Sequence, residues 1–203
     1  MADSAPGANL FEIFDFGESK GRGLRALKSL TPGCKVLDST PSVFVLSNSV
    51  RGQYCDLCFA KSEELLRCSK CKFARYCDRE CQKKAWKEHK IECERVLRVS
   101  PSIPTDLVRL MSRILQKTHS DNTFCSDLSL LVSHQEQLDE QRKEAFSAIL
   151  TVLLQFLGEK DFQTKSPSEW FELFGKISCN SFTICDAELQ PLGKKPLPEP
   201  LHF

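Results

Sequence analysis

The middle of the chain has the apolar periodicity of amphipathic helices. After Thr105 and Asp106, which can cap a helix, apolar residues recur three and four positions apart. The residues of this face are Leu107, Leu110, Met111, Ile114 and Leu115. A polar break over residues 118–126 ends the pattern, and a shorter stretch follows over residues 127–134. We therefore expect a helix after Thr105 that packs one face inward.

Two further helices are predicted beyond this break. Residues 139–157 carry a broad apolar face, and Gly158 follows as a C-cap. Ser166 and Pro167 have the residue types that begin a helix, and this third helix carries Trp170, Phe171 and Phe174. Three or more helices should therefore form one layer of the fold.

The N-terminal third has the signals of β-structure instead. Residues 1–10 are small and polar, and we expect them to be loose. Residues 11–16 mix aromatic and acidic residues as a first strand does, and the glycine-rich stretch 17–23 leads into an apolar–basic alternation. Thr31-Pro32-Gly33 predicts a turn, and residues 35–46 carry another β pattern. Strands before helices make the expected fold class α+β.

Seven cysteines and one histidine between residues 55 and 93 are arranged in four pairs with short spacings. The pairs are Cys55 with Cys58, Cys68 with Cys71, Cys77 with Cys81, and His89 with Cys93. Two-residue gaps suit a tight turn, whereas four-residue steps along a helix place two ligands on one face. Eight ligands are enough for two closed tetrahedral zinc sites, which are structural because no position is left for water.

Disulfides and buried free thiols are the alternative explanations of these cysteines. No secretory signal is recognisable before them, so we expect a reducing compartment in which disulfides are rare. The segment also has few core-forming residues, so a metal would have to hold it together. We expect the remaining cysteines to be small buried hydrophobic residues: Cys34, Cys125, Cys179 and Cys185.

Composition narrows the class of protein. The 203 residues are 41% hydrophobic and 27% charged, which is enough for one or two modest globular domains. The most apolar run, residues 148–157, is too short to span a membrane. The formal net charge of +1 hides a basic segment over residues 51–98. Thiolates and two zinc ions would leave only a small positive excess there.

The cysteine and histidine spacings resemble those of the MYND zinc finger. Tyr76-Cys77 and the run from Cys81 to Trp86 carry the same resemblance. In that family the pairs interleave, so the resemblance implies that the first and third pairs bind one zinc ion. The second and fourth pairs would then bind the other.

Two segments outside the finger extend the resemblance. The sequence KGRGLRA at residues 20–26 and KISCNSFTICDAELQ at residues 176–190 resemble the SET and MYND family of protein lysine methyltransferases, the second string especially that of its third member. In this family the zinc finger interrupts a catalytic SET domain. The resemblance implies a loose segment at 1–10, N-terminal SET strands at 11–54, the finger at 55–93, a helical SET insertion at 94–175 and the start of the SET core at 176–190.

The resemblance also implies contacts with S-adenosylmethionine. By matched position these are Lys20, Gly21 and Arg22 in the N-terminal loop and Asn180 at the methionine end of the cofactor. His134 follows Ser133 as in relatives whose histidine touches the cofactor, although other relatives carry asparagine there. Without the resemblance, the loop is an ordinary hairpin tip and His134 is a polar residue at a helix end. No catalytic residue is implied within the chain.

The resemblance stops at Gln190. Relatives continue into an N-H-S-C segment, tyrosines that line the lysine channel and a post-SET zinc site. Here residues 191–203 contain four prolines, and we expect a divergent, extended and disordered tail. This suggests a truncated form, either an isoform or an incomplete gene model, that is inactive alone and exposes apolar residues of the helical insertion and of a strand over residues 177–189.

Three functions remain open on the sequence. The first is a protein or histone lysine methyltransferase of the cytoplasm and nucleus that acts as a chromatin regulator. The second is an interaction module whose finger binds proline-rich peptides through Phe73, Tyr76, Trp86 and Lys87. The third and least favoured is DNA contact through the basic finger, because its charge excess is small and no recognition helix is evident.

Overall fold

The computed structural model describes residues 10–17, 21–36 and 40–196, and it divides the chain into two compact units, Met1–Thr40 and Pro41–Phe203. The first unit contains strands β1 (Phe11–Asp15) and β2 (Arg22–Ala26), which pair antiparallel. The loop between them closes where the Phe16 amide donates to the Gly21 carbonyl at 2.8 Å. Gly17 and Gly21 both have positive φ there, which favours glycine. The two predicted strands are confirmed, and residues 18–20 between them lie outside the described residues.

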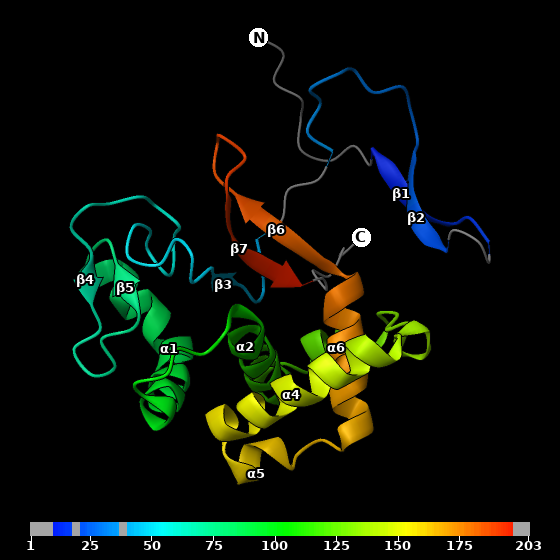
Figure 1. The fold of residues 1–203 in the computed structure, drawn as a ribbon. Helices are drawn as coiled ribbons and strands as arrows, with labels where there is room; N and C mark the ends of the chain where they lie inside the picture. The colour runs from blue at the N-terminus through cyan, green and yellow to red at the C-terminus, as the bar shows by residue number, and fades with distance from the viewer. Residues whose placement is uncertain (1–9, 18–20, 37–39, 197–203) are drawn as a thin grey trace. The chain divides into compact units, whose positions relative to one another are not determined.

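The second unit contains a zinc-finger segment, a helical layer and a small sheet (Figure 1). Its mixed content confirms the predicted α+β class. The elements in chain order are β3 (Val45–Leu46), β4 (Leu66–Arg67), β5 (Arg75–Tyr76), α1 (Arg79–Val99), α2 (Asp106–Ser120), α3 (Asn122–Ser129), η1 (Gln135–Gln137), α4 (Glu140–Leu157), α5 (Glu159–Phe162), α6 (Pro167–Cys179), β6 (Ser181–Cys185) and β7 (Pro191–Pro196).

The helices begin and end largely where capping residues predict. The Thr105 side chain caps α2, Gly158 ends α4, and Ser166 forms a capping box with Glu169 at the start of α6. The polar stretch over residues 118–126 does not interrupt the helices as predicted. Helix α2 continues to Ser120, and the Asp121 side chain accepts a hydrogen bond from the Phe124 amide to start α3 at once.

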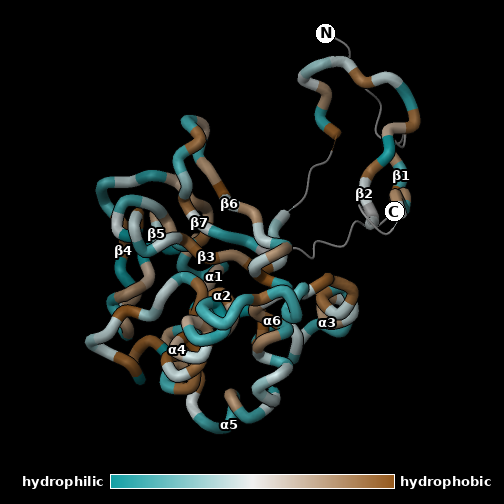
Figure 2. The backbone as a smooth tube through the Cα atoms, turned by 45° about the vertical axis from the view of Figure 1, so that its right-hand side comes forward, coloured by the Kyte–Doolittle hydropathy of each residue, from teal (hydrophilic) through white to brown (hydrophobic). Residues whose placement is uncertain are grey.

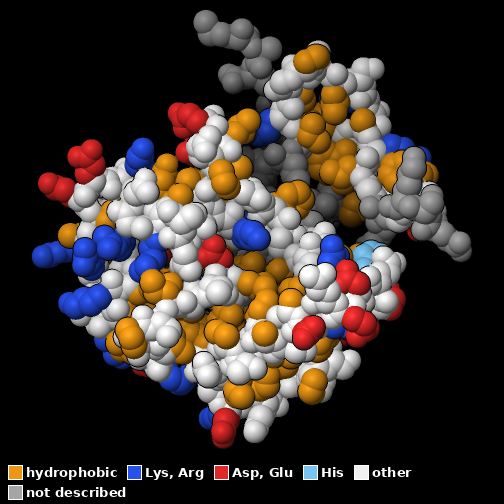
Figure 3. Space-filling model, viewed as in Figure 1, with side chains coloured by type: hydrophobic (Ala, Val, Ile, Leu, Met, Phe, Trp, Pro, Cys, Tyr) orange, Lys and Arg blue, Asp and Glu red, His pale blue; other side chains and the backbone are white. Residues whose placement is uncertain are grey.

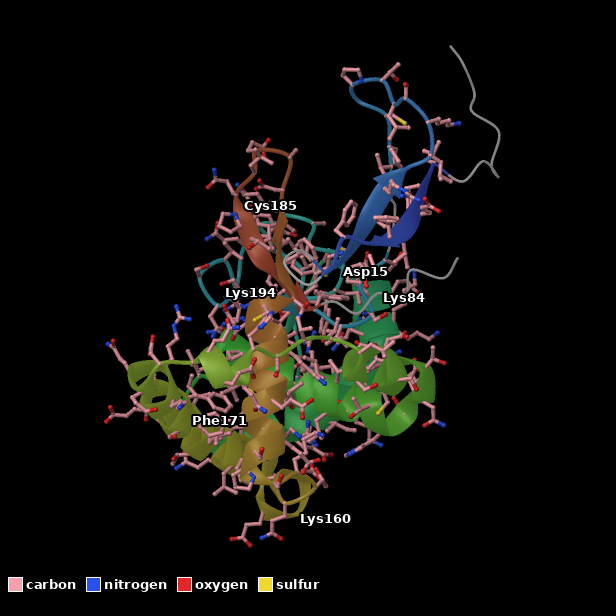
Figure 4. The ribbon with its side chains drawn as sticks, turned by 90° about the vertical axis from the view of Figure 1, so that its right-hand side faces the viewer. Asp15, Lys84, Lys160, Phe171, Cys185 and Lys194 are labelled. Atoms are coloured by element: carbon pink, nitrogen blue, oxygen red, sulfur yellow. The ribbon has the colours of Figure 1, made fainter. Side chains whose placement is uncertain are left out.

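The core of the second unit lies between α2, α4 and α6, where the tube in Figure 2 is brown. Trp170, Phe146 and Phe156 are fully buried, and the Phe171 ring packs edge-on against Phe146 at 4.8 Å between centroids (Figure 4). The helical periodicity therefore predicts the core correctly. No helix in the described part of the chain is long and apolar enough to cross a membrane.

The prediction of a disordered tail is wrong for residues 191–196. They form β7, the central strand of an antiparallel sheet ordered β3-β7-β6, and Figure 4 shows Lys194 on β7 and Cys185 on the neighbouring β6. Pro191 and Pro196 occupy only the two ends of β7, where a missing amide disturbs the ladder least. Residues 197–203 lie outside the described residues.

The strand predicted over residues 177–189 is also shorter in the structure. Helix α6 continues through Cys179, and only Ser181–Cys185 is extended. Gly193 of β7 lies so close to β3 that a Cβ atom would be 2.1 Å from the Val45 carbonyl oxygen. Glycine at this position lets the two strands approach each other.

Candidate metal centres and cofactor residues

The two C-x2-C pairs form the same turn. The Phe59 amide donates to the Cys55 carbonyl at 3.1 Å, and the Lys72 amide donates to the Cys68 carbonyl at 3.0 Å. Phe59 and Lys72, which directly follow the second cysteine of each pair, both have left-handed backbone conformations with φ near 60° (59° and 58°). Each turn therefore directs two sulfur atoms to the same side.

Helix α1 supplies most of the other ligand candidates. Cys77 follows β5, and the Asp78 side chain accepts a hydrogen bond from the Cys81 amide at 2.7 Å, which fixes the first turn of α1. His89 and Cys93 follow on the same helix and are both buried. The helix thus contributes one residue to the first group and two to the second.

The structure gathers the eight residues into two groups of four. One contains Cys55, Cys58, Cys77 and Cys81, and the other contains Cys68, Cys71, His89 and Cys93. Within each group the sulfur and nitrogen atoms all lie within 4.8 Å of one another. This is the interleaved arrangement that the family resemblance implies.

The distances between these atoms test whether zinc fits. Tetrahedral zinc with bonds of about 2.3 Å to sulfur places two sulfurs about 3.8 Å apart. The Sγ atoms of Cys68 and Cys93 are 3.8 Å apart, and those of Cys58 and Cys77 are 3.7 Å apart. With about 2.0 Å to nitrogen, a sulfur and a nitrogen should lie about 3.5 Å apart. The distance from Cys71 Sγ to His89 Nε2 is 3.5 Å, so both groups fit zinc.

The other four cysteines do not behave as predicted. Cys125, Cys179 and Cys185 are exposed, and Cys34 is only half-buried, so the prediction that they are buried small residues is wrong. Each lies on a turn, a strand or the outer face of a helix, where spacing alone does not reveal which side faces the core. Among the described residues, none of the four belongs to a group that could hold a metal ion.

Two of the residues predicted to contact a peptide are part of the core instead. Phe73 and Tyr76 are 5% and 1% exposed, whereas Trp86 is 44% exposed and Lys87 is also exposed. Phe73 packs in the main hydrophobic core and Tyr76 among the ligand cysteines, so of the four residues only Trp86 and Lys87 of α1 are accessible. Lys and Arg side chains gather on the side of the molecule where α1, β4 and β5 lie (Figure 3).

A buried charge network beside the finger was not predicted. Glu92 of α1 contacts Arg109 and Arg113 of α2, and Arg109 also contacts Asp56. Burial would raise the pKa of Glu92, but Arg113 and Arg109 outweigh that effect and hold the pKa well below its usual range. The available signal was that Arg109 and Arg113 stand one turn apart among apolar residues of α2.

The candidate cofactor residues fall in both units. Lys20 lies outside the described residues, Gly21 ends the hairpin loop with φ of 63°, and the backbone of Arg22 begins β2. In the second unit, His134 is exposed and has a left-handed backbone with φ of 47°. Asn180 is the C-cap residue of α6.

The structure brings Asn180 close to the segment that precedes His134. Asn180 Nδ2 donates to the Val132 carbonyl at 2.9 Å and to the Lys176 carbonyl at 2.8 Å. A Cβ atom on Gly175 would lie 2.3 Å from the Ser133 carbonyl oxygen, which shows how tightly this segment packs on α6. These contacts place His134 and Asn180 in the same region of the second unit.

Comparisons with known proteins agree with these features. The sequence profile of the MYND finger matches residues 55–93. The chain is 37% identical over 182 residues to histone-lysine N-methyltransferase SMYD3 of Mus musculus, and 38% identical over 181 residues to the SMYD3 of Homo sapiens. The chain belongs to the SET and MYND family. Each of these alignments covers 86% of the chain and 42% of the relative.

A second branch of the SET and MYND family matches equally well. N-lysine methyltransferase SMYD2-A of Xenopus laevis is 38% identical over 195 residues, which is 93% of this chain and 45% of the relative. This member of the SET and MYND family therefore spans less than half the length of the relatives it matches.

Proposed function

We propose that this chain carries the structural zinc finger and part of the S-adenosylmethionine site of a protein lysine N-methyltransferase. Its main support is that SET and MYND relatives named as lysine methyltransferases align with 86% or more of the chain. In this reaction an uncharged lysine amine attacks the methyl group of the sulfonium in line, so the protein's task is to position cofactor and amine. The methyl transfer is proposed for a protein that contains this chain.

The zinc ions in this proposal are structural. Cys55, Cys58, Cys77 and Cys81 would hold one ion, and Cys68, Cys71, His89 and Cys93 the other. Each ion would have four protein ligands and no position for water, which excludes it from activating a nucleophile. Their role is to hold the finger and the start of α1 in place.

The cofactor residues in this proposal are Lys20, Gly21, Arg22, His134 and Asn180. Both Nδ2 protons of Asn180 are engaged by main-chain carbonyls of Val132 and Lys176. The group that Asn180 can offer a ligand is therefore Oδ1, which only accepts hydrogen bonds. An acceptor suits the α-ammonium group of S-adenosylmethionine, which agrees with a contact at the methionine end of the cofactor.

Binding of S-adenosylmethionine to residues 1–203 tests this proposal. We expect residues 1–203 to bind S-adenosylmethionine weakly and to transfer no methyl group, because they align with less than half of each relative. Amide NMR spectra recorded with millimolar cofactor should show shifts at Gly21 and Asn180. Asn180→Ala should remove the shift at position 180, whereas Ser178→Ala, at an exposed position of α6, should keep it. An absence of shifts at both positions would contradict the proposed site.

A second candidate function is the binding of proline-rich peptides by the finger. Trp86 and Ile91 of α1 are 44% and 39% exposed, and Lys87 and Ile91 line a cavity of about 430 Å³ that lies between α1 and α2. The exposed Trp86 is not among the residues that line this cavity, but its ring is itself a surface on which proline rings pack well.

Peptide titration distinguishes this function from the first. Trp86→Ala should weaken binding of a proline-rich peptide at least tenfold, whereas Phe182→Ala, which removes a ring from β6 that is at least as exposed, should not. Equal effects of the two variants would show that the peptide adheres nonspecifically to exposed rings. Binding of DNA in preference to every peptide, with a steep salt dependence, would favour DNA contact instead.

A further inference from the structure

Four charged side chains meet at the junction between the finger and helix α2. Asp56, Glu92 and Arg109 are 5%, 1% and 0% exposed, and the Arg113 side chain is 12% exposed. Burying charges is costly unless each one is paired and hydrogen-bonded, so removing one member leaves its partners unpaired. The arrangement of these four groups is therefore tightly constrained.

Arg109 connects three separate parts of the chain. Its Nε donates to Glu92 Oε1 of α1 at 2.9 Å, its Nη2 donates to Asp56 Oδ1 at 3.2 Å, and its Nη1 donates to the Leu46 carbonyl of β3 at 2.9 Å. The planar, always charged guanidinium has enough donors in a fixed fork to make these contacts at once, which a lysine cannot do.

Asp56 is adjacent to a ligand of the first metal group. It directly follows Cys55, and its Oδ2 accepts a hydrogen bond from the Arg75 amide at 2.8 Å. The Asp56 amide in turn donates to the Arg75 carbonyl at 2.8 Å. Asp56 thus ties the first C-x2-C turn to β5, which leads directly to Cys77.

Glu92 is adjacent to ligands of the second metal group. It directly precedes Cys93, and its Oε2 lies 3.6 Å from His89 Nδ1. The opposite ring nitrogen, Nε2, faces Cys71 Sγ. His89 Nδ1 is buried and has no hydrogen-bond partner within 3.5 Å among the described residues. Glu92 is therefore the carboxylate positioned to accept a hydrogen bond from Nδ1–H.

We propose that Glu92 and Arg109 are positioning residues for the two zinc sites. Glu92 accepts the Nδ1 proton of His89 and so presents the Nε2 lone pair to the metal, as carboxylates commonly do for histidine ligands. Arg109 holds Glu92 and Asp56 together, and through them one ligand-bearing segment of each site. Helix α2, which supplies no ligand, thereby controls how tightly both zinc ions are retained.

This coupling acts in both directions. Because α2 stabilises the arrangement that binds zinc, zinc binding must stabilise the docking of α2 by the same free energy. The coupling runs through the contacts of Arg109, so loss of either zinc ion loosens these contacts, whereas the contact of Arg95 with Ser112 does not involve the residues beside the ligands.

Zinc release from the full chain into a chelator tests the role of Arg109. Arg109→Met should increase the rate of release of both ions about ten- to a hundredfold, the usual effect of losing an outer-shell partner. Arg109→Lys keeps the charge but cannot reach all three partners, so its rate should fall between those of the wild type and Arg109→Met.

Arg95→Met is the matched control. Arg95 is a buried arginine on the same helix as Cys93, but it pairs with Asp161 and Ser112 instead of the carboxylates beside the ligands. Its loss should lower stability and leave zinc release unchanged. Equal acceleration in Arg95→Met and Arg109→Met would overturn the proposal, because general destabilisation would then explain both. A wild-type rate in Arg109→Met would overturn it as well.

Glu92→Gln tests the role of Glu92 directly, and this test remains valid even if the Arg109 variants do not fold. Histidine ¹⁵N NMR of the zinc-loaded chain should show metal-bound Nε2 and protonated Nδ1 at His89. In Glu92→Gln the Nδ1 resonance should shift, because a neutral amide accepts its proton more weakly than a carboxylate. An unchanged Nδ1 resonance would show that Glu92 does not hold this ring.

Discussion

Gly175→Ala tests the contact on which the proposed cofactor region of the second unit depends. Gly175 lies inside α6, where alanine normally stabilises a helix by about 1 kcal/mol relative to glycine. Here the added methyl group would lie 2.3 Å from the Ser133 carbonyl oxygen, whereas ordinary contacts of this kind begin at 3.4 Å. The segment before His134 or the helix itself must therefore move by about 1 Å.

The neighbouring hydrogen bond sets the size of the effect. A displacement of about 1 Å stretches the contact from Asn180 Nδ2 to the Val132 carbonyl, now 2.9 Å, beyond hydrogen-bond range. Losing this bond costs about 1 kcal/mol, and overpacking costs about 1–3 kcal/mol. After the gain in helix propensity is subtracted, we expect Gly175→Ala to lower the free energy of unfolding by about 1–3 kcal/mol.

Urea unfolding of the zinc-loaded chain measures this change. With a denaturant dependence of about 2 kcal/mol per molar urea, the midpoint should fall by about 0.5–1.5 M. Ser178→Ala, an exposed substitution on the same helix, should leave the midpoint unchanged or raise it slightly. A midpoint for Gly175→Ala at or above that of the wild type would refute the close packing of Ser133 on α6.

Two further predictions concern the metal and the sheet. Native mass spectrometry should find two zinc ions in the chain, one after Cys71→Ala and still two after Cys125→Ala, and a single ion in the wild type would contradict the two-site assignment. Gly193→Ala should destabilise the chain by about 2–3 kcal/mol because the new Cβ atom meets the Val45 carbonyl at 2.1 Å. In the strand control Gly23→Ala the new Cβ atom meets only the edge of an aromatic ring, so an equal loss there would contradict this reasoning.

Local signals in the sequence predict much of the fold. Ligand spacings predict both metal groups because each pair is set by one turn or one helical step, and the family resemblance supplies how the pairs combine. Capping residues such as Thr105, Gly158 and Ser166 predict helix ends because each acts through its own neighbouring amides or carbonyls. These features depend on atoms only a few residues apart.

Composition misled the prediction for residues 191–196. Four prolines after Gln190 suggest a tail, but only Pro191 and Pro196 fall in the strand, and both occupy its ends. What makes β7 a central strand is a long-range contact: Gly193 permits close approach to Val45, more than a hundred residues earlier. Proline content shows how many backbone amides a segment lacks as hydrogen-bond donors. It gives no information on which other strand is available as a partner.

The buried charge network around Arg109 was also not predictable from the sequence, because its members are far apart along the chain. Arg109 is separated by 17 residues from Glu92 and by 53 residues from Asp56, and in the sequence it is one of many basic residues. A buried arginine is tolerated only because three partners converge on it, and such convergence is a property of the assembled fold. Zinc ligands can be predicted from their spacing, but only the structure shows that Arg109 of helix α2 contacts Glu92 and Asp56, the neighbours of two ligands.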